Sequence, residues 1–343
     1  MNNILDLIKN KCFIIAEAGV NHNGDINIAK KLVDKAKEAG VDAIKFQTFR
    51  AENLVTKEAP KAEYQKETTG DGSQFEMLKK LALSLEDHII LKKYCEEKGI
   101  MFISTPFDFE SVDLLEKTDV SLYKVSSGDL TNLPLLNYIA NKNKPIILST
   151  GMANLGEVEE AINTIYETGN NKLILLHCTS NYPTAYEDVN LRAMLTMQEA
   201  FKLPVGYSDH TIGIEVPIAA VTLGAKVIEK HFTLDRKMEG PDHKASLEPY
   251  ELKMMVNSIR NIEIAMGDGI KRCNKSEEKS KFVSRKSIVA KHDIKKGQVI
   301  TQDLIVYKRP ASGLPPKFVK YILGKKARAE IRKDEVIDFE KVY

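Results

Sequence analysis

Short apolar runs alternate along this sequence with longer stretches in which apolar residues recur at helical spacing. Each apolar run ends abruptly at polar residues. This alternation is typical of strand–helix units in a parallel sheet. Strands are expected over residues 13–16, 43–46, 100–103, 122–125, 145–148, 173–176, 204–207 and 226–228.

Eight such units predict an α/β fold in which the sheet closes into a (β/α)8 TIM barrel. The helix signals between the strands agree with this prediction. Asp25 is placed to cap a helix that ends at Gly40, and the pattern predicts further helices over 86–98, 213–223 and about 249–266. The polar residues collect at the carboxyl ends of the strands, which is the face where such barrels build their sites.

After the last of these helices, the pattern changes to short β-like runs without long helical spacing. We therefore expect a barrel domain over 1–269, a linker over 270–284 and a small β-rich domain over 285–343. The segment 281–343 carries sixteen Lys and Arg against seven Asp and Glu. This basic module either presents a solvated surface or faces an anionic ligand or an acidic neighbouring domain.

Composition excludes several classes of function. The net charge of the 343 residues is +2, which gives no argument for nucleic acid or a membrane surface as a partner. No apolar run approaches the roughly 20 residues that span a bilayer. The four cysteines have no close spacing, so neither a zinc knuckle nor a disulfide framework is indicated. We expect reduced cysteines in a cytoplasmic protein.

Two histidines end neighbouring predicted strands. His210 follows the run 204–207 and His231 follows the run 226–228, and each histidine lies beside a carboxylate. Two neutral imidazoles from adjacent strand ends can hold one divalent metal and leave positions open for substrate and water. The alternative for either histidine alone is a hydrogen-bonded residue of the core.

Further polar residues at the predicted mouth suggest chemistry on an anion. Glu17 ends the first strand and is a candidate for acid–base work or substrate binding, with a structural carboxylate as the alternative. Lys45 and Lys124 lie within strands and must point into the mouth. Either they pair with phosphate or carboxylate, or one of them forms a Schiff base as in lysine aldolases. The hydroxyls expected to complete a cradle for a small anion belong to Thr105, Ser127, Ser149 and Ser208.

Other segments have weaker signals. The segment 50–76 is too long for an ordinary connection and is interpreted as an active-site cover or a partner contact. Asp242 either binds substrate hydroxyls or ends a turn, and His22 either contacts substrate or orders its loop. His88 and His292 are expected on the surface. The sequence contains neither a GxGxxG nor a GxxxxGK[ST] fingerprint, so nucleotide binding by those routes is unsupported.

A series of motifs resembles those of the bacterial and archaeal sialic acid synthases, the N-acetylneuraminate synthase family, which includes legionaminic acid synthases. The motifs, in order, are EAGVNHNG, KFQTF, STPFD, STGM, LHCTSNYPT, GYSDHT, EKHFTLD and GPDHKASLEP. The resemblance runs from about residue 13 to the end. The C-terminal RKSIVAKHDIKKGQVIT resembles the antifreeze-like (SAF) domain of the same family.

The resemblance implies condensation of phosphoenolpyruvate with an open-chain N-acetylated amino sugar, giving a nine-carbon 2-keto acid and phosphate. It implies that His210 and His231 bind Mn²⁺ or Mg²⁺, and that Glu17 handles the water that adds at carbon 2. It also implies a domain-swapped homodimer in which Arg309 reaches the sugar in the partner subunit's site. Phosphoenolpyruvate would be held by Lys45, Thr105, Lys124, Ser127, Ser149 and Ser208. The sugar would be surrounded by Tyr182, Glu229 and Asp242.

Some positions depart from the family's pattern. Asp129 stands where members that make sialic acid often have glutamate, which puts a direct substrate contact in doubt. Phe46 and Phe49 replace histidines found in some members and cannot act as ligands. The sequence ASG at 311–313 replaces a common GNG. These changes concern the sugar more than the chemistry.

We therefore expect an N-acetylneuraminate synthase that uses N-acetylmannosamine. An enzyme with the same mechanism that uses a 2,4-diacetamido-trideoxyhexose to make legionaminic or pseudaminic acid is the alternative, with legionaminic acid ahead of pseudaminic acid. A lysine-based aldolase and a non-catalytic sugar- or metal-binding protein are alternatives from other classes.

Overall fold

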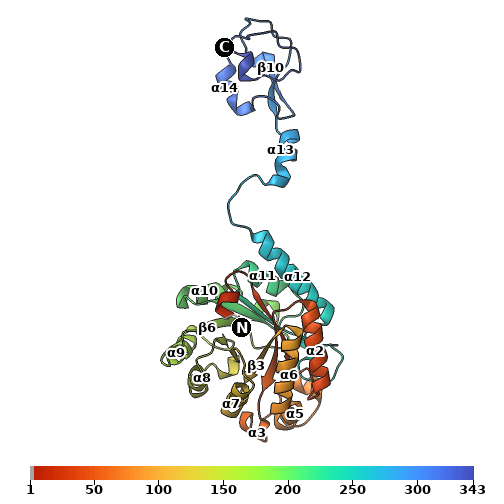
Figure 1. Cartoon of the computed structure of the whole chain (residues 1–343), viewed down its shortest axis with the longest axis vertical. Coiled ribbons are helices and arrows are strands. Elements are labelled where there is room, and N and C mark those ends of the chain that lie inside the picture. The colour runs from red at the N-terminus through yellow and green to blue at the C-terminus, as the bar shows by residue number, and fades with distance from the viewer. Residues whose placement is uncertain (1–3) are drawn as a thin grey trace. The chain divides into compact units, whose positions relative to one another are not determined.

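The structure is a computed structural model that describes residues 4–343 and divides into two compact units. The first unit extends to Gly267 and the second runs from Asp268 to Tyr343. Figure 1 labels the elements of both units. Within the described residues, no helix combines the length and the apolar character needed to cross a membrane.

The first unit contains one parallel sheet of eight strands. Its order is β3-β2-β1-β8-β7-β6-β5-β4, and β3 and β4 at the two ends of this order contact each other, so the sheet is a nearly closed barrel. The predicted α/β barrel is confirmed. The strands are β1 (Phe13–Gly19), β2 (Ala43–Thr48), β3 (Met101–Pro106), β4 (Tyr123–Val125), β5 (Ile146–Ser149), β6 (Leu173–Cys178), β7 (Val205–Asp209) and β8 (Val227–His231).

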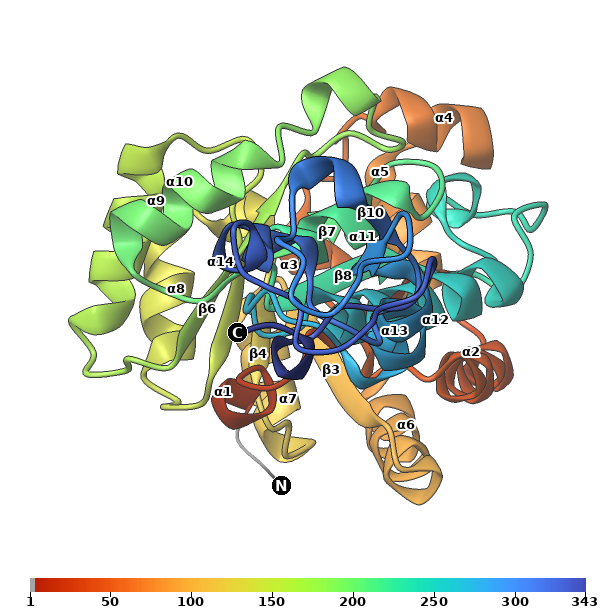
Figure 2. The ribbon, with the colours of Figure 1, turned by 90° about the horizontal axis from the view of Figure 1, so that it is seen from above.

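Helices surround the strands of this unit, as Figure 2 shows. Asp25 caps α2 by accepting from the Asn27 amide, and Gly40 ends that helix in the left-handed region at φ 86°, as expected from the sequence. The helices are α1 (Ile4–Leu7), α2 (Ile26–Ala39), α3 (Ala51–Leu54), α4 (Glu63–Thr69), α5 (Gln74–Leu81), α6 (Leu85–Lys98), α7 (Phe109–Lys117), α8 (Leu133–Ala140), α9 (Leu155–Tyr166), α10 (Arg192–Phe201), α11 (Glu215–Thr222) and α12 (Pro249–Met266).

Strand alternation determines what the barrel interior contains. On β1, Phe13 and Ile15 belong to the cluster inside the barrel, whereas Ile14 and Ala16 pack in the cluster that holds the helices. The interior cluster also includes Ile4 and Ile8, which close its lower end. Apolar side chains therefore fill the barrel where its strands begin, and the polar residues of the candidate site lie where its strands end.

Most strands run further than the sequence pattern predicts. For example, β1 continues through Glu17 to Gly19, and β8 continues through Glu229 to His231. The prediction ended these strands at the first polar residue because polar side chains usually mark the surface. Here Glu17, Glu229 and His231 remain in the ladder because they face the cavity at the mouth of the barrel and are buried there.

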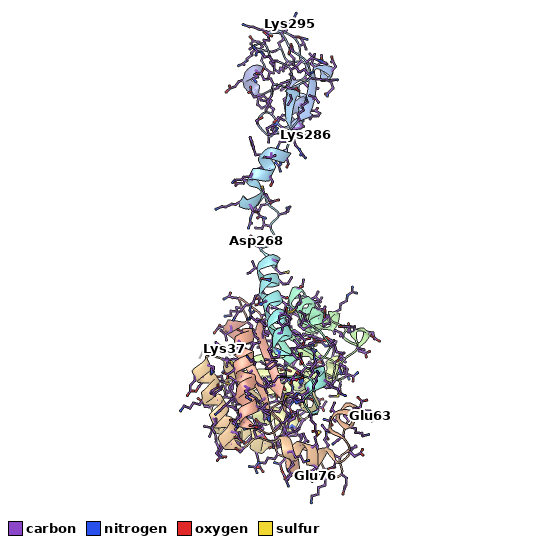
Figure 3. All side chains as sticks on the ribbon, turned by 90° about the vertical axis from the view of Figure 1, so that its right-hand side faces the viewer. Lys37, Glu63, Glu76, Asp268, Lys286 and Lys295 are labelled. Carbon is purple, nitrogen blue, oxygen red and sulfur yellow. The ribbon has the colours of Figure 1, made fainter. Side chains whose placement is uncertain are left out.

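The long connection after β2 forms a small folded cover of its own. Its helices α3, α4 and α5 bring Phe75 and Leu78 into an apolar cluster with Val20 and Phe49. The Lys61 ammonium holds the end of α4 by donating to the carbonyl and hydroxyl of Thr69 and to two following carbonyls. Glu63 and Glu76 lie on the exposed surface of this cover, which we call the α3–α5 cover (Figure 3).

The second unit has a separate core. It contains α13 (Glu278–Ser284), β9 (Ser287–Ala290), β10 (Ile305–Lys308) and α14 (Val319–Ile322). The strands β9 and β10 pair antiparallel, and isolated bridges connect several further segments. Ile288, Ile294 and Ile337 are fully buried in its apolar cluster. Part of the expected linker 270–284 is helical, since α13 lies within it.

Candidate active site

The inward face of the strands changes from apolar to polar within one step of the alternation. Phe13 and Ile15 on β1 are followed on the same face by Glu17, and Ala43 on β2 is followed by Lys45. The same step leads from Leu122 to Lys124 on β4. Buried ionisable groups thus form a layer directly above the apolar filling of the barrel.

These groups form an alternating chain of charges. Lys45 Nζ lies 3.0 Å from Glu17 Oε2 and 3.5 Å from Glu229 Oε2. Lys124 Nζ lies 3.4 Å from Glu229 Oε1. All four side chains are at most 5% exposed. Two cations and two carboxylates are therefore held out of water at the floor of one cavity, which is costly unless each charge is compensated.

The two carboxyl groups of this chain differ in acidity. Burial raises the pKa of Glu17 to about 7, although Lys45 opposes that change. Burial also disfavours the charge on Glu229, but Lys124 and Lys45 together outweigh it and lower the pKa of Glu229 to about 2. Two nearby carboxyl groups with separated pKa values are typical of an acid–base site. Glu17 can exchange a proton near neutral pH, whereas Glu229 remains a fixed negative charge.

The pKa values of the two lysines are also shifted in opposite directions. Burial opposes the charge on Lys45, but Glu17 and Glu229 outweigh it and raise its pKa above the ordinary value. For Lys124 burial dominates and lowers the pKa, although Glu229 opposes that change. Lys45 is therefore a fixed cation, and Lys124 is the more easily deprotonated of the two.

Hydroxyl groups complete the floor of the cavity. Thr105 accepts from Lys45 Nζ at 3.1 Å, and Ser208 donates to Glu229 Oε1 at 2.8 Å. Ser127 Oγ accepts from the Gly151 amide at 2.9 Å and lies 3.1 Å from Cys178 Sγ. Among the described residues, the buried Ser149 hydroxyl finds no hydrogen-bond partner. All four of the hydroxyl residues expected in the cradle line this cavity.

The two predicted histidines lie together at the rim. The ring centroids of His210 and His231 are 5.5 Å apart, and the ring of Tyr182 is 4.2 Å from that of His210. Burial lowers the pKa of His210 to about 4 and that of His231 well below its usual value, so both rings are neutral. Neutral imidazoles are the form that binds metals.

The hydrogen bonds of these rings leave nitrogens available. His210 Nδ1 bonds to the Thr179 carbonyl at 2.7 Å, which leaves Nε2. His231 Nδ1 is buried and has no hydrogen-bond partner in the part of the chain that the structure describes. Residues 4–343 contain no cluster of three or more His, Cys, Asp or Glu side chains suited to a metal. The donor set thus fits a divalent ion with two protein ligands, whose other positions would be filled by substrate and water.

Asp242 and Gln47 border the same space. Asp242 Oδ2 lies 3.9 Å from His231 Nδ1, and burial raises the pKa of Asp242 to about 6. Gln47 Nε2 lies 3.3 Å from Glu17 Oε1. A Cβ on Gly19 would come within 3.5 Å of all three side chains, those of Glu17, Gln47 and Asp242. Gly19 is therefore the position that lets these side chains converge.

The cavity has a volume of about 520 Å³ and one largely apolar wall. Val20 and Phe107 contribute to this wall, and the α3–α5 cover supplies the rest. The lining residues from the cover are Gln65, Gln74, Met77, Leu78 and Leu81. Gln65 and Gln74 lie within the segment 50–76 that was expected to cover the site or contact a partner, whereas Met77, Leu78 and Leu81 lie just beyond it.

Sequence reasoning placed most lining residues and missed others. Glu17, Tyr182, Glu229, Asp242 and the residues named above meet in one cavity. Gln47, Cys178 and the wall were missed. The KFQTF motif offered a signal for Gln47, because a polar side chain two residues after Lys45 shares its face. Within the wall, Met77, Leu78 and Leu81 lie outside every quoted motif and outside the predicted strands.

Several expected residues lie elsewhere. Asp129 is outside the cavity lining and accepts from Ser126 Oγ at 2.7 Å, and Phe46 is fully buried in the core. His22 accepts from the Gly24 amide and orders its own loop. The expectation of an exposed His88 is wrong, because its ring is buried between Thr48 and the Ser84 carbonyl.

Arg309 belongs to the second unit, where its side chain is exposed and it precedes Pro310. Its expected role in the site of a partner subunit stays a prediction. The second unit also holds His292, which is exposed as expected.

Comparison with known families decides what this cavity belongs to. The NeuB family model matches residues 32–271, and the SAF domain model matches residues 285–342. The chain belongs to the NeuB family. It is therefore an enzyme of the family that makes nonulosonic acids, and the alternative of a non-catalytic binding protein is wrong.

Individual relatives of this NeuB-family chain have different products in their names. The N,N'-diacetyllegionaminic acid synthase of Campylobacter jejuni is 54% identical, over 95% of this chain and 99% of that protein. The enzyme of the same name from Legionella pneumophila is 50% identical, over 91% and 89%. Human N-acetylneuraminate-9-phosphate synthase is 38% identical, over 95% and 91%.

A solved structure agrees with this assignment to the NeuB family. The N-acetylneuraminic acid synthetase of Leptospira borgpetersenii, in complex with citrate, superimposes with a TM-score of 0.70 at 36% identity. The match covers 79% of this chain and 90% of that one.

Proposed function

We propose that this enzyme condenses phosphoenolpyruvate with a 2,4-diacetamido-trideoxyhexose to give N,N'-diacetyllegionaminic acid and phosphate. The observation that carries the proposal is the 54% identity, across nearly the whole of both chains, to a relative named for that product. Relatives named for N-acetylneuraminate 9-phosphate or pseudaminic acid are 38% identical. The comparison therefore favours the alternative over N-acetylmannosamine, the sugar expected first.

The cavity wall supports a deoxygenated sugar. Met77, Leu78 and Leu81 of the α3–α5 cover present apolar surface to the cavity, together with Val20 and Phe107. A methyl group gains by transfer to such a surface, whereas a hydroxyl group placed there loses its hydrogen bonds to water. The side-chain amides of Gln65 and Gln74 on the same wall are suited to acetamido groups.

The floor of the cavity suits phosphoenolpyruvate, which carries a carboxylate and a phosphate. Lys45 and Lys124 supply two buried cations, and the four hydroxyl groups supply donors beside them. The unpartnered Ser149 hydroxyl is one donor that a bound anion would satisfy. Glu229 holds both ammonium groups in place and is itself held by Ser208.

Glu17 is suited to move the proton of the attacking water. Because its pKa is about 7, it is partly ionised at neutral pH and can accept a proton as water adds to carbon 2 of the condensed adduct. Loss of phosphate from carbon 2 then leaves the keto group of the product. The neighbouring ammonium of Lys45 favours the ionised form that accepts the proton.

His210 and His231 would hold a divalent cation, Mn²⁺ or Mg²⁺, which when bound supplies Lewis-acid polarisation of the sugar carbonyl. Tyr182 packs against His210 and limits the motion of its ring. Asp242 lies close enough to both Glu17 and His231 to orient a sugar hydroxyl between them.

The decisive experiment measures phosphate release and product mass with two sugars, the 2,4-diacetamido-trideoxyhexose and N-acetylmannosamine. We expect N,N'-diacetyllegionaminic acid from the first and a kcat/KM at least tenfold lower for the second. Equal or better use of N-acetylmannosamine would overturn the proposed substrate.

The same assay separates the lysine aldolase, whose candidate lysine is Lys124 because its pKa is lowered. We expect EDTA to abolish phosphate release and Mn²⁺ to restore it, with no adduct trapped by borohydride. Full activity in EDTA together with a trapped Lys124 adduct would favour the aldolase.

A further inference from the structure

A second buried ion pair lies directly behind the two histidines, outside the cavity. Lys230 Nζ lies 2.5 Å from Asp209 Oδ2, and both side chains are 0% exposed. Neither residue lines the cavity. The proposed chemistry uses neither charge, so the reason for burying them must lie in what they connect.

The pair joins the two strands that end in the histidines. Asp209 and Lys230 are direct register partners of β7 and β8. His210 directly follows Asp209, and His231 directly follows Lys230. Because successive side chains of a strand point to opposite faces, an ion pair on the outer face lies immediately behind two rings on the inner face.

The Lys230 ammonium also grips the chain on both sides of His210. It bonds to the carboxylate of Asp209 and to the carbonyl of Thr211. The Thr211 amide and hydroxyl donate back to Asp209 at 3.2 and 3.1 Å. The residues before and after His210 are thus tied to the residue before His231 by one side chain.

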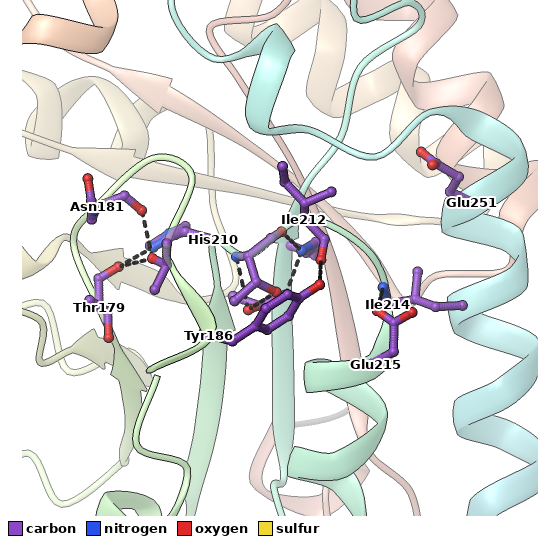
Figure 4. A network of polar contacts seen from close by, with 12 residues as sticks. Thr179, Asn181, Tyr186, His210, Ile212, Ile214, Glu215 and Glu251 are labelled. Carbon is purple, nitrogen blue, oxygen red and sulfur yellow. Dashed lines mark hydrogen bonds and ion pairs between the residues drawn. The ribbon is translucent and has the colours of Figure 1, made fainter. Parts of the chain in front are cut away.

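A second contact joins the same two strands on the inner face, one residue earlier in each strand. There the Ser208 hydroxyl donates to Glu229. Figure 4 shows His210 and the loop that follows it. Two residues of the connection after β6 contact this region: Thr179 lies beside His210, and the Tyr186 hydroxyl donates to the Ile212 carbonyl. The connection after β7 is therefore held at several points around His210.

Stability alone does not account for this pair. Replacing a buried ion pair by apolar residues of similar volume is often neutral or stabilising, because desolvation offsets the attraction. Hydrogen bonds to a buried ammonium, unlike apolar contacts, have fixed distances and directions. A fully buried network of this kind adds geometric precision to the groups it holds.

We propose that Lys230, Asp209 and Thr211 form a positioning network that fixes the spacing of the His210 and His231 rings for the metal. The inference rests on the proposed metal site. The three residues contact neither substrate nor metal and act only through the backbone of the two histidines. Without the network the two rings are no longer held at a fixed spacing. Its removal therefore weakens metal binding more than it lowers the stability of the fold.

The test removes both charges at once with the double variant Asp209→Asn and Lys230→Met, which leaves no uncompensated buried charge. Mn²⁺ binding to the full chain is measured by electron paramagnetic resonance without substrate, alongside the melting temperature. We expect the Mn²⁺ dissociation constant to rise tenfold or more. Phosphate release should recover largely at saturating Mn²⁺, so that the metal dependence shifts more than the maximal rate.

The control removes a different, partly buried ion pair, Arg260 with Asp42, which precedes β2 at the opposite end of the barrel. The double variant Arg260→Met and Asp42→Asn should lower the melting temperature and leave the Mn²⁺ dissociation constant unchanged. Equal weakening of Mn²⁺ binding in both double variants would overturn the inference, because the effect would then follow general stability.

A milder variant covers the case in which the double variant does not fold. Thr211→Val removes only the hydroxyl donated to Asp209, and we expect a two- to fivefold rise in the Mn²⁺ dissociation constant. Unchanged Mn²⁺ binding in a folded double variant, or in Thr211→Val where the double variant does not fold, overturns the network. A wild-type chain that binds neither Mn²⁺ nor Mg²⁺ refutes the metal site itself, which is a different outcome.

Discussion

Glu17 combines deep burial with contact to a single cation, and this combination determines its acidity. Its side chain is 2% exposed and lies 3.0 Å from Lys45. Burial raises the pKa towards neutrality, and the lysine keeps the ionised form accessible. A glutamine of the same shape preserves the packing but cannot accept a proton.

We predict that Glu17→Gln lowers kcat for phosphate release by about 100-fold or more, the range of general acid–base catalysis. Phosphoenolpyruvate binding, measured by calorimetry, should change far less. Glu38→Gln is the matched control, because Glu38 is exposed on α2, where it pairs with Lys35. A Glu17→Gln enzyme that keeps more than a tenth of its turnover would contradict the assigned role.

The buried His22 makes the free energy of unfolding depend on pH. Its ring is fully buried, and burial lowers its pKa to about 4 from 6.5. The unfolded chain therefore takes up a proton below pH 6.5 that the folded chain refuses until about pH 4. Stability is lost as the pH falls through this window, by about 3 kcal/mol for this group.

Urea unfolding at pH 7, 6, 5 and 4 measures this effect. The wild type should lose about 3 kcal/mol more than His22→Gln over the window, because the variant lacks the titrating group. His292→Gln, which changes an exposed histidine, should keep the slope of the wild type. Parallel slopes for the wild type and His22→Gln would contradict the prediction.

The sequence indicated which polar residues lie at the barrel mouth where those residues end strands. Glu17, His210 and His231 were predictable because a charged or imidazole group directly after an apolar run marks the polar end of a strand at the barrel mouth. His88 was not, since a histidine within a helix has no periodic signature of burial. Its ring is buried because Thr48 and the Ser84 carbonyl satisfy both nitrogens, and both contacts depend on the fold.

Among the elements, the barrel strands and α2 were predictable, whereas the helices of the α3–α5 cover were not. Strand and helix periods are local, and Asp25 and Gly40 mark the ends of α2 chemically. The cover helices are short, and α3 and α4 lack a side-chain N-cap hydrogen bond. They are stabilised by the apolar cluster beneath them and by Lys61, which are tertiary contacts.

Helix α5 has one face on the cavity and the other in solvent, which allows a direct test of specificity. Met77 is buried on the cavity wall and Lys79 is exposed. We predict that Met77→Gln lowers kcat/KM for the diacetamido-trideoxyhexose about tenfold relative to N-acetylmannosamine, because an apolar contact becomes polar. Lys79→Gln should leave the ratio unchanged. A ratio unaffected by Met77→Gln would remove the wall from the specificity argument.

For the whole molecule, the repeated strand–helix unit made the barrel predictable, because eight units of one kind allow few other arrangements. The texture change near 270 likewise indicated a second compact unit.

The expected exchange of second units between subunits can be tested by mixing variants. In a domain-swapped homodimer, Glu17→Gln and Arg309→Ala chains, each poorly active alone, should regain activity when they are unfolded and refolded together. One site of each mixed dimer then combines an intact Glu17 with an intact Arg309 from the other chain. Light scattering should give about twice the 38.5 kDa of one chain. No recovery in a confirmed mixed dimer would place Arg309 in its own subunit's site.

The α3–α5 cover has a small apolar cluster of its own and an ammonium latch at Lys61, while the charged floor rests on the strands. Part of the wall that would contact the sugar substituents and the charged groups that would carry out the reaction thus belong to different segments of the chain. A cover grafted from a relative with another sugar should therefore transplant its preference without retuning the acid, the base or the anion cradle. Enzymes that make different nine-carbon sugars on this barrel would then need to differ only in the α3–α5 cover.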